Sequence, residues 1–82
     1  MELHPKLQEI QERLDGTQPG PWRYYKEDRD HEGGSDFIMT GDGTKRGEDL
    51  EILGSTEGDM EFIGHAKQDI EFLLRIITEL SL

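Results

Sequence analysis

The sequence contains no cysteine, and this absence excludes disulfide bonds, thiolate zinc sites and cysteine nucleophiles. Hydrophobic residues make up only 32% of the 82 residues, so little apolar material is present for a core. No apolar run approaches the ~20 residues that a membrane span needs, and the amino terminus has no apolar signal core. We therefore expect one small domain, residues 1–82, that is soluble, cytoplasmic and not associated with membranes.

Positive charge is also scarce. Nineteen Asp and Glu residues against nine Lys and Arg residues give a net charge of -10 at pH 7. This charge repels nucleic acid over most of the surface, so direct nucleic-acid binding is disfavoured. The acidic residues are spread along the whole chain, which is more typical of general solubility than of a stripe that mimics nucleic acid. An acidic inhibitor that covers a basic surface of a partner protein stays open as an alternative.

The spacing of apolar residues predicts a helix near the start of the chain, over residues 3–14. Pro5 fits its first turn, and Gly16 stands where a left-handed C-cap belongs. The apolar positions recur at spacings of four, three and four and share one face: Leu3, Leu7, Ile10 and Leu14.

A second, longer helix is predicted from about residue 57 almost to the carboxyl end. Thr56 and Asp59 resemble a capping box, and acidic residues in the first turn complement the helix dipole. The apolar positions that follow recur every three or four residues: Phe62, Ile63, Ala66, Ile70, Leu73, Leu74, Ile77 and Leu80.

Three short segments between the helices predict strands: residues 22–25, 37–39 and 50–53. Alternation places Trp22 and Tyr24 on one face of the first strand, and this aromatic pair should face the core. We therefore predict an α+β fold of order α-β-β-β-α, in which a three-stranded antiparallel sheet is packed by both helices.

His65 and Asp69 stand four residues apart on the long helix, a spacing that brings an imidazole and a carboxylate within hydrogen-bonding reach. Phe62 and Phe72 flank them on the same stripe, a composition common in small-molecule pockets. The alternative is an ordinary surface pair. The stripe also makes the apolar face wider than one sheet requires, so the excess could bury the first helix or a second subunit. We expect a homo-oligomer, and whether the stripe is a pocket or a subunit seam stays open.

Part of a calcium-binding pattern lies between residues 28 and 36. Met39 stands where that pattern needs a bidentate Glu, and its flanks predict strands rather than helices, so we expect a solvated acidic loop and no metal site. The first, third, fifth, sixth and ninth positions of the pattern are matched by Asp28, Asp30, Glu32, Gly33 and Asp36.

Residues 41–47 form a glycine-bearing loop with two cations, Lys45 and Arg46, that could face a phosphate. The spacing matches neither a P-loop nor a dinucleotide fingerprint, so a flexible hairpin is the alternative. No serine stands in a strand-turn-helix elbow, and no pair of carboxylates is singled out by spacing. We therefore expect a protein that is not an enzyme and uses no cofactor.

Two segments carry a resemblance to a known group. The elbow T-Q-P-G-P-W (residues 17–22) and the helix D-M-E-F-I-G-H-A-K-Q-D-I (residues 59–70) resemble small, mostly uncharacterised proteins encoded by bacteriophages, prophages and their hosts. Members of that group look like T-x-G-P-W followed by D-A-E-F-I-A-H-A-R-x-D and a leucine-rich helix. The chain departs from this pattern at Met60, Gly64 and Lys67, and the loss of an arginine at 67 removes a bidentate guanidinium.

The resemblance implies a phage-encoded protein in the cytoplasm of an infected bacterium. Small phage proteins often counter host defence, either by sequestering a nucleotide immune signal or by blocking a defence protein. We therefore expect a non-enzymatic protein that sequesters a phosphorylated ligand such as a cyclic nucleotide or an ADP-ribose-type signal; a phage accessory protein without a ligand is a further alternative. The predicted ligand-binding residues are Trp22, Arg23, Tyr24, Lys45, Arg46, Phe62, His65 and Asp69.

Overall fold

The computed structural model describes residues 4–80. The chain forms a helix α1 (Pro5–Asp15), strands β1 (Trp22–Tyr25) and β2 (Phe37–Thr40), a 3-10 turn η1 (Gly43–Lys45) and a long helix α2 (Glu57–Leu80). β1 and β2 pair antiparallel, with Trp22 opposite Thr40 and Tyr25 opposite Phe37.

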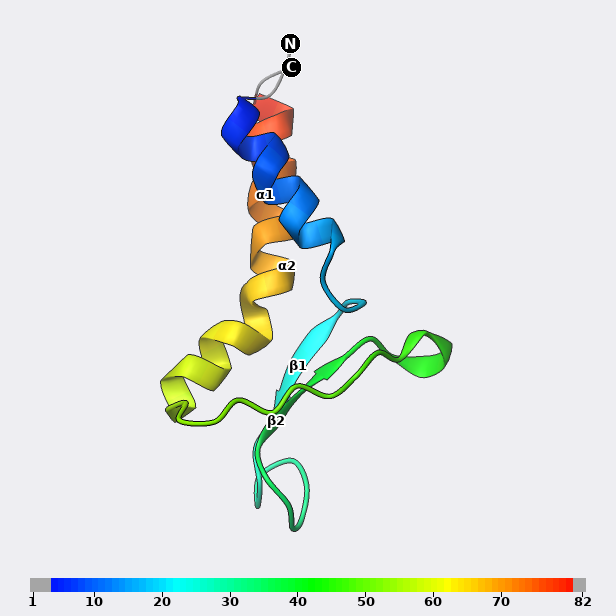
Figure 1. Cartoon of the computed structure of the whole chain (residues 1–82), viewed down its shortest axis with the longest axis vertical. Coiled ribbons are helices and arrows are strands. Elements are labelled where there is room, and N and C mark those ends of the chain that lie inside the picture. The colour runs from blue at the N-terminus through cyan, green and yellow to red at the C-terminus, as the bar shows by residue number, and fades with distance from the viewer. Residues whose placement is uncertain (1–3, 81–82) are drawn as a thin grey trace.

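The two helices run antiparallel and side by side, and together they form an arm that points away from the sheet (Figure 1). The first half of α2 crosses the sheet, whereas α1 packs on the second half of α2 (Figure 1). The prediction that both helices pack on the sheet is therefore wrong for α1. The resulting molecule is elongated, with extents of 50 × 29 × 18 Å.

The predicted three-stranded sheet is wrong, because residues 50–53 do not form a strand. Leu50 alone reaches the free edge of β2, where it exchanges two backbone hydrogen bonds of 2.8 Å with Ile38. The chain then turns away toward the start of α2, and Leu53 is fully exposed. A strand requires several consecutive pairings, and Leu50 alone of this segment pairs with β2 before the chain leads into α2.

The ends of α1 match the prediction from the sequence only in part. Pro5 is the first helical residue, and the His4 imidazole accepts a hydrogen bond from the Lys6 backbone N–H. Gly16 is the C-cap as predicted, but its φ of -83° is right-handed, so a left-handed cap is absent there. Leu3 of the predicted helix lies outside the described residues.

The capping box at the start of α2 is confirmed. The Thr56 backbone N–H donates to Asp59 Oδ2 at 2.9 Å, and the Asp59 backbone N–H donates to Thr56 Oγ1 at 3.0 Å. Between residues 4 and 80, neither helix combines the length and the apolar character that would let it cross a membrane.

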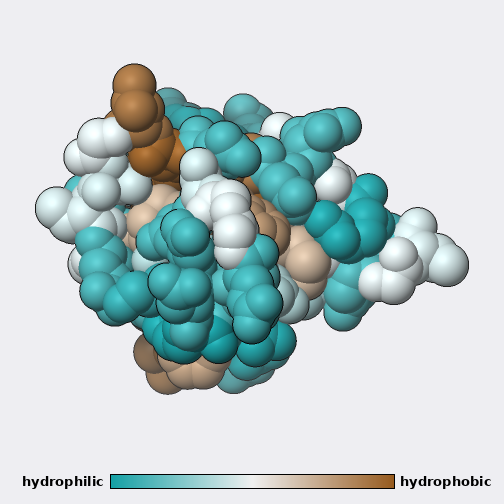
Figure 2. All heavy atoms as spheres, turned by 90° about the horizontal axis from the view of Figure 1, so that it is seen from below, coloured by the Kyte–Doolittle hydropathy of each residue, from teal (hydrophilic) through white to brown (hydrophobic). Residues whose placement is uncertain are grey.

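The core lies between the sheet and the first half of α2. Its buried side chains are Tyr24, Ile38 and Met60, and Trp22 packs at its border. The predicted inward face of β1 is thus confirmed. The core is small because the hydrophobic fraction is low, and the sheet end of the surface is mostly hydrophilic (Figure 2).

The contact between α2 and β1 is close enough to depend on a glycine. A Cβ atom at Gly64 would lie 3.0 Å from Tyr24 Cβ and 3.1 Å from the Tyr24 backbone N. One turn later, the Gln68 side-chain amide accepts from the Trp22 N–H at 2.9 Å and donates to the Trp22 carbonyl at 2.7 Å. Gln68 thereby pairs the free edge of β1 as a neighbouring strand would.

Replacement of Gly64 by alanine is expected to lower the free energy of unfolding by about 1–3 kcal/mol, because the new methyl group is forced against the β1 backbone. The matched control is Gly58→Ala on the same helix, where the nearest atom to an added Cβ is Thr56 Oγ1 at 3.8 Å. That change should raise the free energy of unfolding by up to about 1 kcal/mol. Urea denaturation measures both, and changes of the same sign would contradict the close contact.

Candidate functional site

The structure brings part of the predicted site together in a small hollow between β1 and α2. The hollow has a volume of about 170 Å³. Four predicted ligand residues line it: Trp22, Arg23, Tyr24 and His65. β1 supplies the first three and α2 supplies the last, so the fold joins residues about forty positions apart in the chain.

Three further residues line the hollow that were not among the predicted ligand-binding residues: Arg29, Glu61 and Gly64. The Arg29 guanidinium donates to Glu61 Oε1 at 3.0 Å and to Asp30 Oδ2 at 2.8 Å, and it lies 5.1 Å from the centre of the Tyr24 ring. The bonds to Asp30 and then to Glu61 raise the pKa of Arg29 above its ordinary value. The ion pair with Glu61 joins the β1–β2 connection to α2.

Tyr24 is anchored beside the hollow by a carboxylate. Its hydroxyl donates to Asp36 Oδ2 at 2.5 Å, and the Glu27 backbone N–H donates to Asp36 Oδ1 at 2.9 Å. The bond to Asp36, together with burial, raises the pKa of Tyr24 to about 12. The same bond, followed by the one from Glu27, lowers the pKa of Asp36 below its usual range.

His65 is exposed at the rim of the hollow, and its partner is Glu61 rather than Asp69. Nδ1 lies 2.8 Å from the Glu61 backbone carbonyl and 4.0 Å from Glu61 Oε2. A carbonyl oxygen only accepts, so Nδ1 carries the proton and Nε2 is the acceptor of the neutral ring. The spacing of four residues that suggested the pair with Asp69 also occurs between Glu61 and His65, and it could have indicated this partner.

The aromatic border predicted on α2 does not surround this hollow. Phe62 is 75% exposed and lines a separate surface depression with Ile52 and Leu53, and Phe72 is 52% exposed beneath the Arg75 guanidinium. The aromatic walls come instead from Trp22 and Tyr24 on β1. Asp69 is exposed on α2 and is not among the residues lining the hollow.

The two cations of the 41–47 loop also lie apart from the hollow. The loop projects from the far end of β2, away from α2 (Figure 1). Arg46 donates to Asp49 Oδ1 at 2.7 Å, and neither Lys45 nor Arg46 lines the hollow. Gly41 has a φ of +70° and turns the chain tightly back toward Lys45. The structure therefore does not bring these two cations together with the other predicted ligand residues that line the hollow.

Two carboxylates of the acidic connection between β1 and β2 accept hydrogen bonds from neighbouring residues of the chain. Asp30 accepts from the Lys26 backbone N–H and from Arg29, and these two bonds lower the pKa of Asp30. Asp36 holds Tyr24. Within residues 4–80 no group of His, Asp and Glu side chains is arranged to hold a metal ion.

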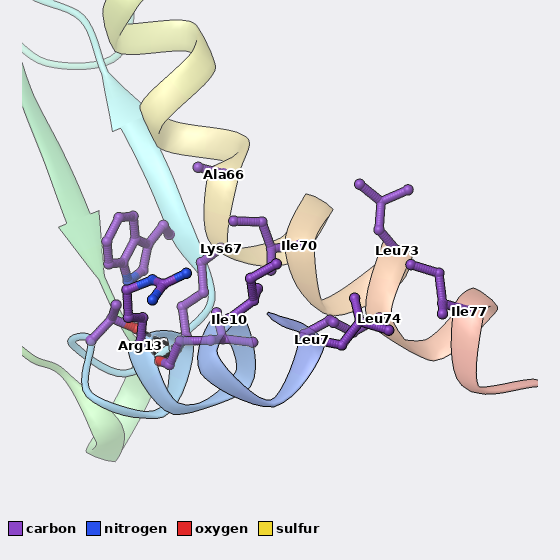
Figure 3. A pocket seen from close by; sticks show the side chains of 12 residues that line it. Leu7, Ile10, Arg13, Ala66, Lys67, Ile70, Leu73, Leu74 and Ile77 are labelled. Carbon is purple, nitrogen blue, oxygen red and sulfur yellow. Dashed lines mark hydrogen bonds between the residues drawn. The ribbon is translucent and has the colours of Figure 1, made fainter. Parts of the chain in front are cut away.

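A larger hollow lies outside the predicted site, in the arm. This apolar groove between α1 and α2 has a volume of about 450 Å³ (Figure 3). Its walls include Leu7 and Ile10 from α1 and Ile70, Leu73 and Ile77 from α2. Trp22 lines both the apolar groove and the small hollow, so it separates the two.

Comparison with protein-family models, with curated proteins and with solved structures finds no match to this chain.

Loss of the Tyr24 hydroxyl is expected to change the pH dependence of stability. Because the pKa of Tyr24 is raised from 10.0 to about 12, the free energy of unfolding should fall as pH rises between these values. Because the pKa of Asp36 is lowered, stability should also fall as pH drops through that depressed pKa. In Tyr24→Phe both slopes should be smaller. Urea denaturation across pH measures them, and identical profiles for the two proteins would refute the coupling.

Proposed function

We propose that this protein is a non-enzymatic binding protein that sequesters a small phosphate-bearing ligand of the cyclic-nucleotide or ADP-ribose type at the hollow between β1 and α2. The observation that supports this proposal is the convergence of Trp22, Arg23, Tyr24 and His65 on that hollow. In the context of the phage resemblance, sequestration of such a signal would counter a host defence system.

The chemistry of the hollow suits an anion despite the net charge of the chain. Arg23 lines the hollow and is exposed, its guanidinium lies 5.0 Å from the Tyr25 ring centre, and a guanidinium is a donor well suited to phosphate oxygens. His65 supplies a second polar group at the same rim. Arg29 already serves Asp30 and Glu61, so its contribution is to position the wall.

The size of the hollow limits what it can enclose. Pockets for whole drug-sized ligands measure ~300–1,000 Å³, and this hollow measures about 170 Å³. It therefore suits the phosphate-bearing end of a ligand, with the remainder resting on the surrounding surface. Trp22 is only partly buried and offers an aromatic surface at the same place, whereas Tyr24 is buried.

Isothermal calorimetry with cyclic mononucleotides, cyclic dinucleotides and ADP-ribose tests the proposal. We expect binding by at least one of these, weakened by about tenfold to a hundredfold in Arg23→Ala, because a charge-assisted hydrogen bond contributes ~1.5–3 kcal/mol. His65→Ala should weaken the same ligand by a smaller factor.

The matched control is the double variant Lys45→Ala, Arg46→Ala, which removes two cations that lie outside the hollow. It should bind as the parent does. The proposal fails if no ligand in the panel gives heat, or if the control loses as much affinity as Arg23→Ala.

A further inference from the structure

We propose that two copies of this chain associate through the apolar groove between α1 and α2, and that the four helices form an antiparallel bundle. The groove has a volume of about 450 Å³, and apolar side chains from both helices line it (Figure 3). This interface shares Trp22 with the ligand hollow and no other lining residue, and its test does not depend on the proposed function.

The arm lacks the second layer that a stable apolar face requires. A helix stripe is buried by packing against another layer of structure, whereas α1 and α2 beyond the sheet form one layer only (Figure 1). Along the arm only Leu14 and Leu74 are buried. Ile70 remains 37% exposed and Leu73 55% exposed on the open side.

The radius of gyration is larger than that of a compact domain, which agrees with a missing layer of helices on the arm. A compact domain of this length has an expected radius of gyration of ~12 Å, whereas the chain has one of 15.0 Å. The excess comes from the arm, which extends without cover along the longest axis (Figure 1). An identical two-helix layer would supply what the fold lacks.

A second copy suits this groove because an antiparallel helix pair is complementary to itself about a two-fold axis. The two cationic residues of the groove, Arg13 and Lys67, lie at its sheet end with Trp22, and the far end is lined by Leu7 and Ile77 (Figure 3). In an antiparallel pairing the cations of the two copies lie at opposite ends. A parallel pairing would bring them together and is disfavoured.

The area of the α1–α2 face limits the expected affinity of the dimer. The arm from residue 66 to residue 80 spans ~22 Å, and two adjacent helices are ~20 Å wide, which gives roughly 450 Å² of face per copy. Two such faces give roughly 900 Å², just short of the ~1,000 Å² at which specific interfaces begin, so the dimer is a weak one. The expected dimer therefore dissociates at about micromolar concentration. Because each copy has a net charge of -10, added salt should strengthen it.

Sedimentation velocity over a concentration series, at low and high salt, tests the dimer. We expect a monomer–dimer equilibrium in the parent, with more dimer at high salt. Leu73→Glu would place a carboxylate in the groove of each copy and should weaken the dimer by roughly a hundredfold or more. Leu73→Ala keeps the helix apolar and should weaken it by a smaller factor, which guards against loss of folding in the glutamate variant.

The control is Leu53→Glu, which adds the same charge at a fully exposed residue that does not line the groove. It should dimerise about as well as the parent. The proposal is overturned if the parent is a monomer at every concentration, if its assemblies are larger than dimers, or if the Leu53 and Leu73 glutamate variants behave alike while circular dichroism shows both to be folded.

Discussion

The free edge of β1 is held by one side chain of α2, and the remaining architecture depends on this contact. Gln68 satisfies both the N–H and the carbonyl of Trp22, while Gly64 lets the helix approach the backbone of Tyr24. A two-stranded sheet is marginal alone, because each strand has an unpaired edge. The helix covers one edge, and Leu50 bonds to the other. A sheet of two strands is therefore sufficient in this fold, because both of its edges are covered.

The same contact creates the candidate site. Gly64 has no side chain, so the space beside Tyr24 is bordered by Glu61 and His65, which stand one turn before and one residue after it. The Arg29–Glu61 ion pair closes one side of this space. Exposed ion pairs contribute little to stability, so its structural effect is to fix the wall of the hollow.

The long helix serves two separate regions. Its first half completes the core with Met60 and Gly64, and its second half continues past the sheet and packs against α1 (Figure 1). Trp22 stands at the junction, where its indole N–H donates to the Gln18 carbonyl and its side chain lines both hollows. The sheet end and the arm therefore meet at one residue, and each presents its own surface.

Periodicity alone was sufficient to predict both helices, the Thr56–Asp59 capping box and the inward face of Trp22 and Tyr24, because these features depend on residues close in sequence. The third strand was not predictable in this way, since Leu50 could pair only as far as the path to α2 allows. The same limit applies to the candidate site. A spacing of four residues fits both Asp69 and Glu61 as the partner of His65. Only the packing of α2 on β1 places Arg29 and Glu61 in one hollow and leaves Lys45, Arg46 and Phe62 outside it. Local spacing determines which residues share a face, and long-range packing decides what that face meets.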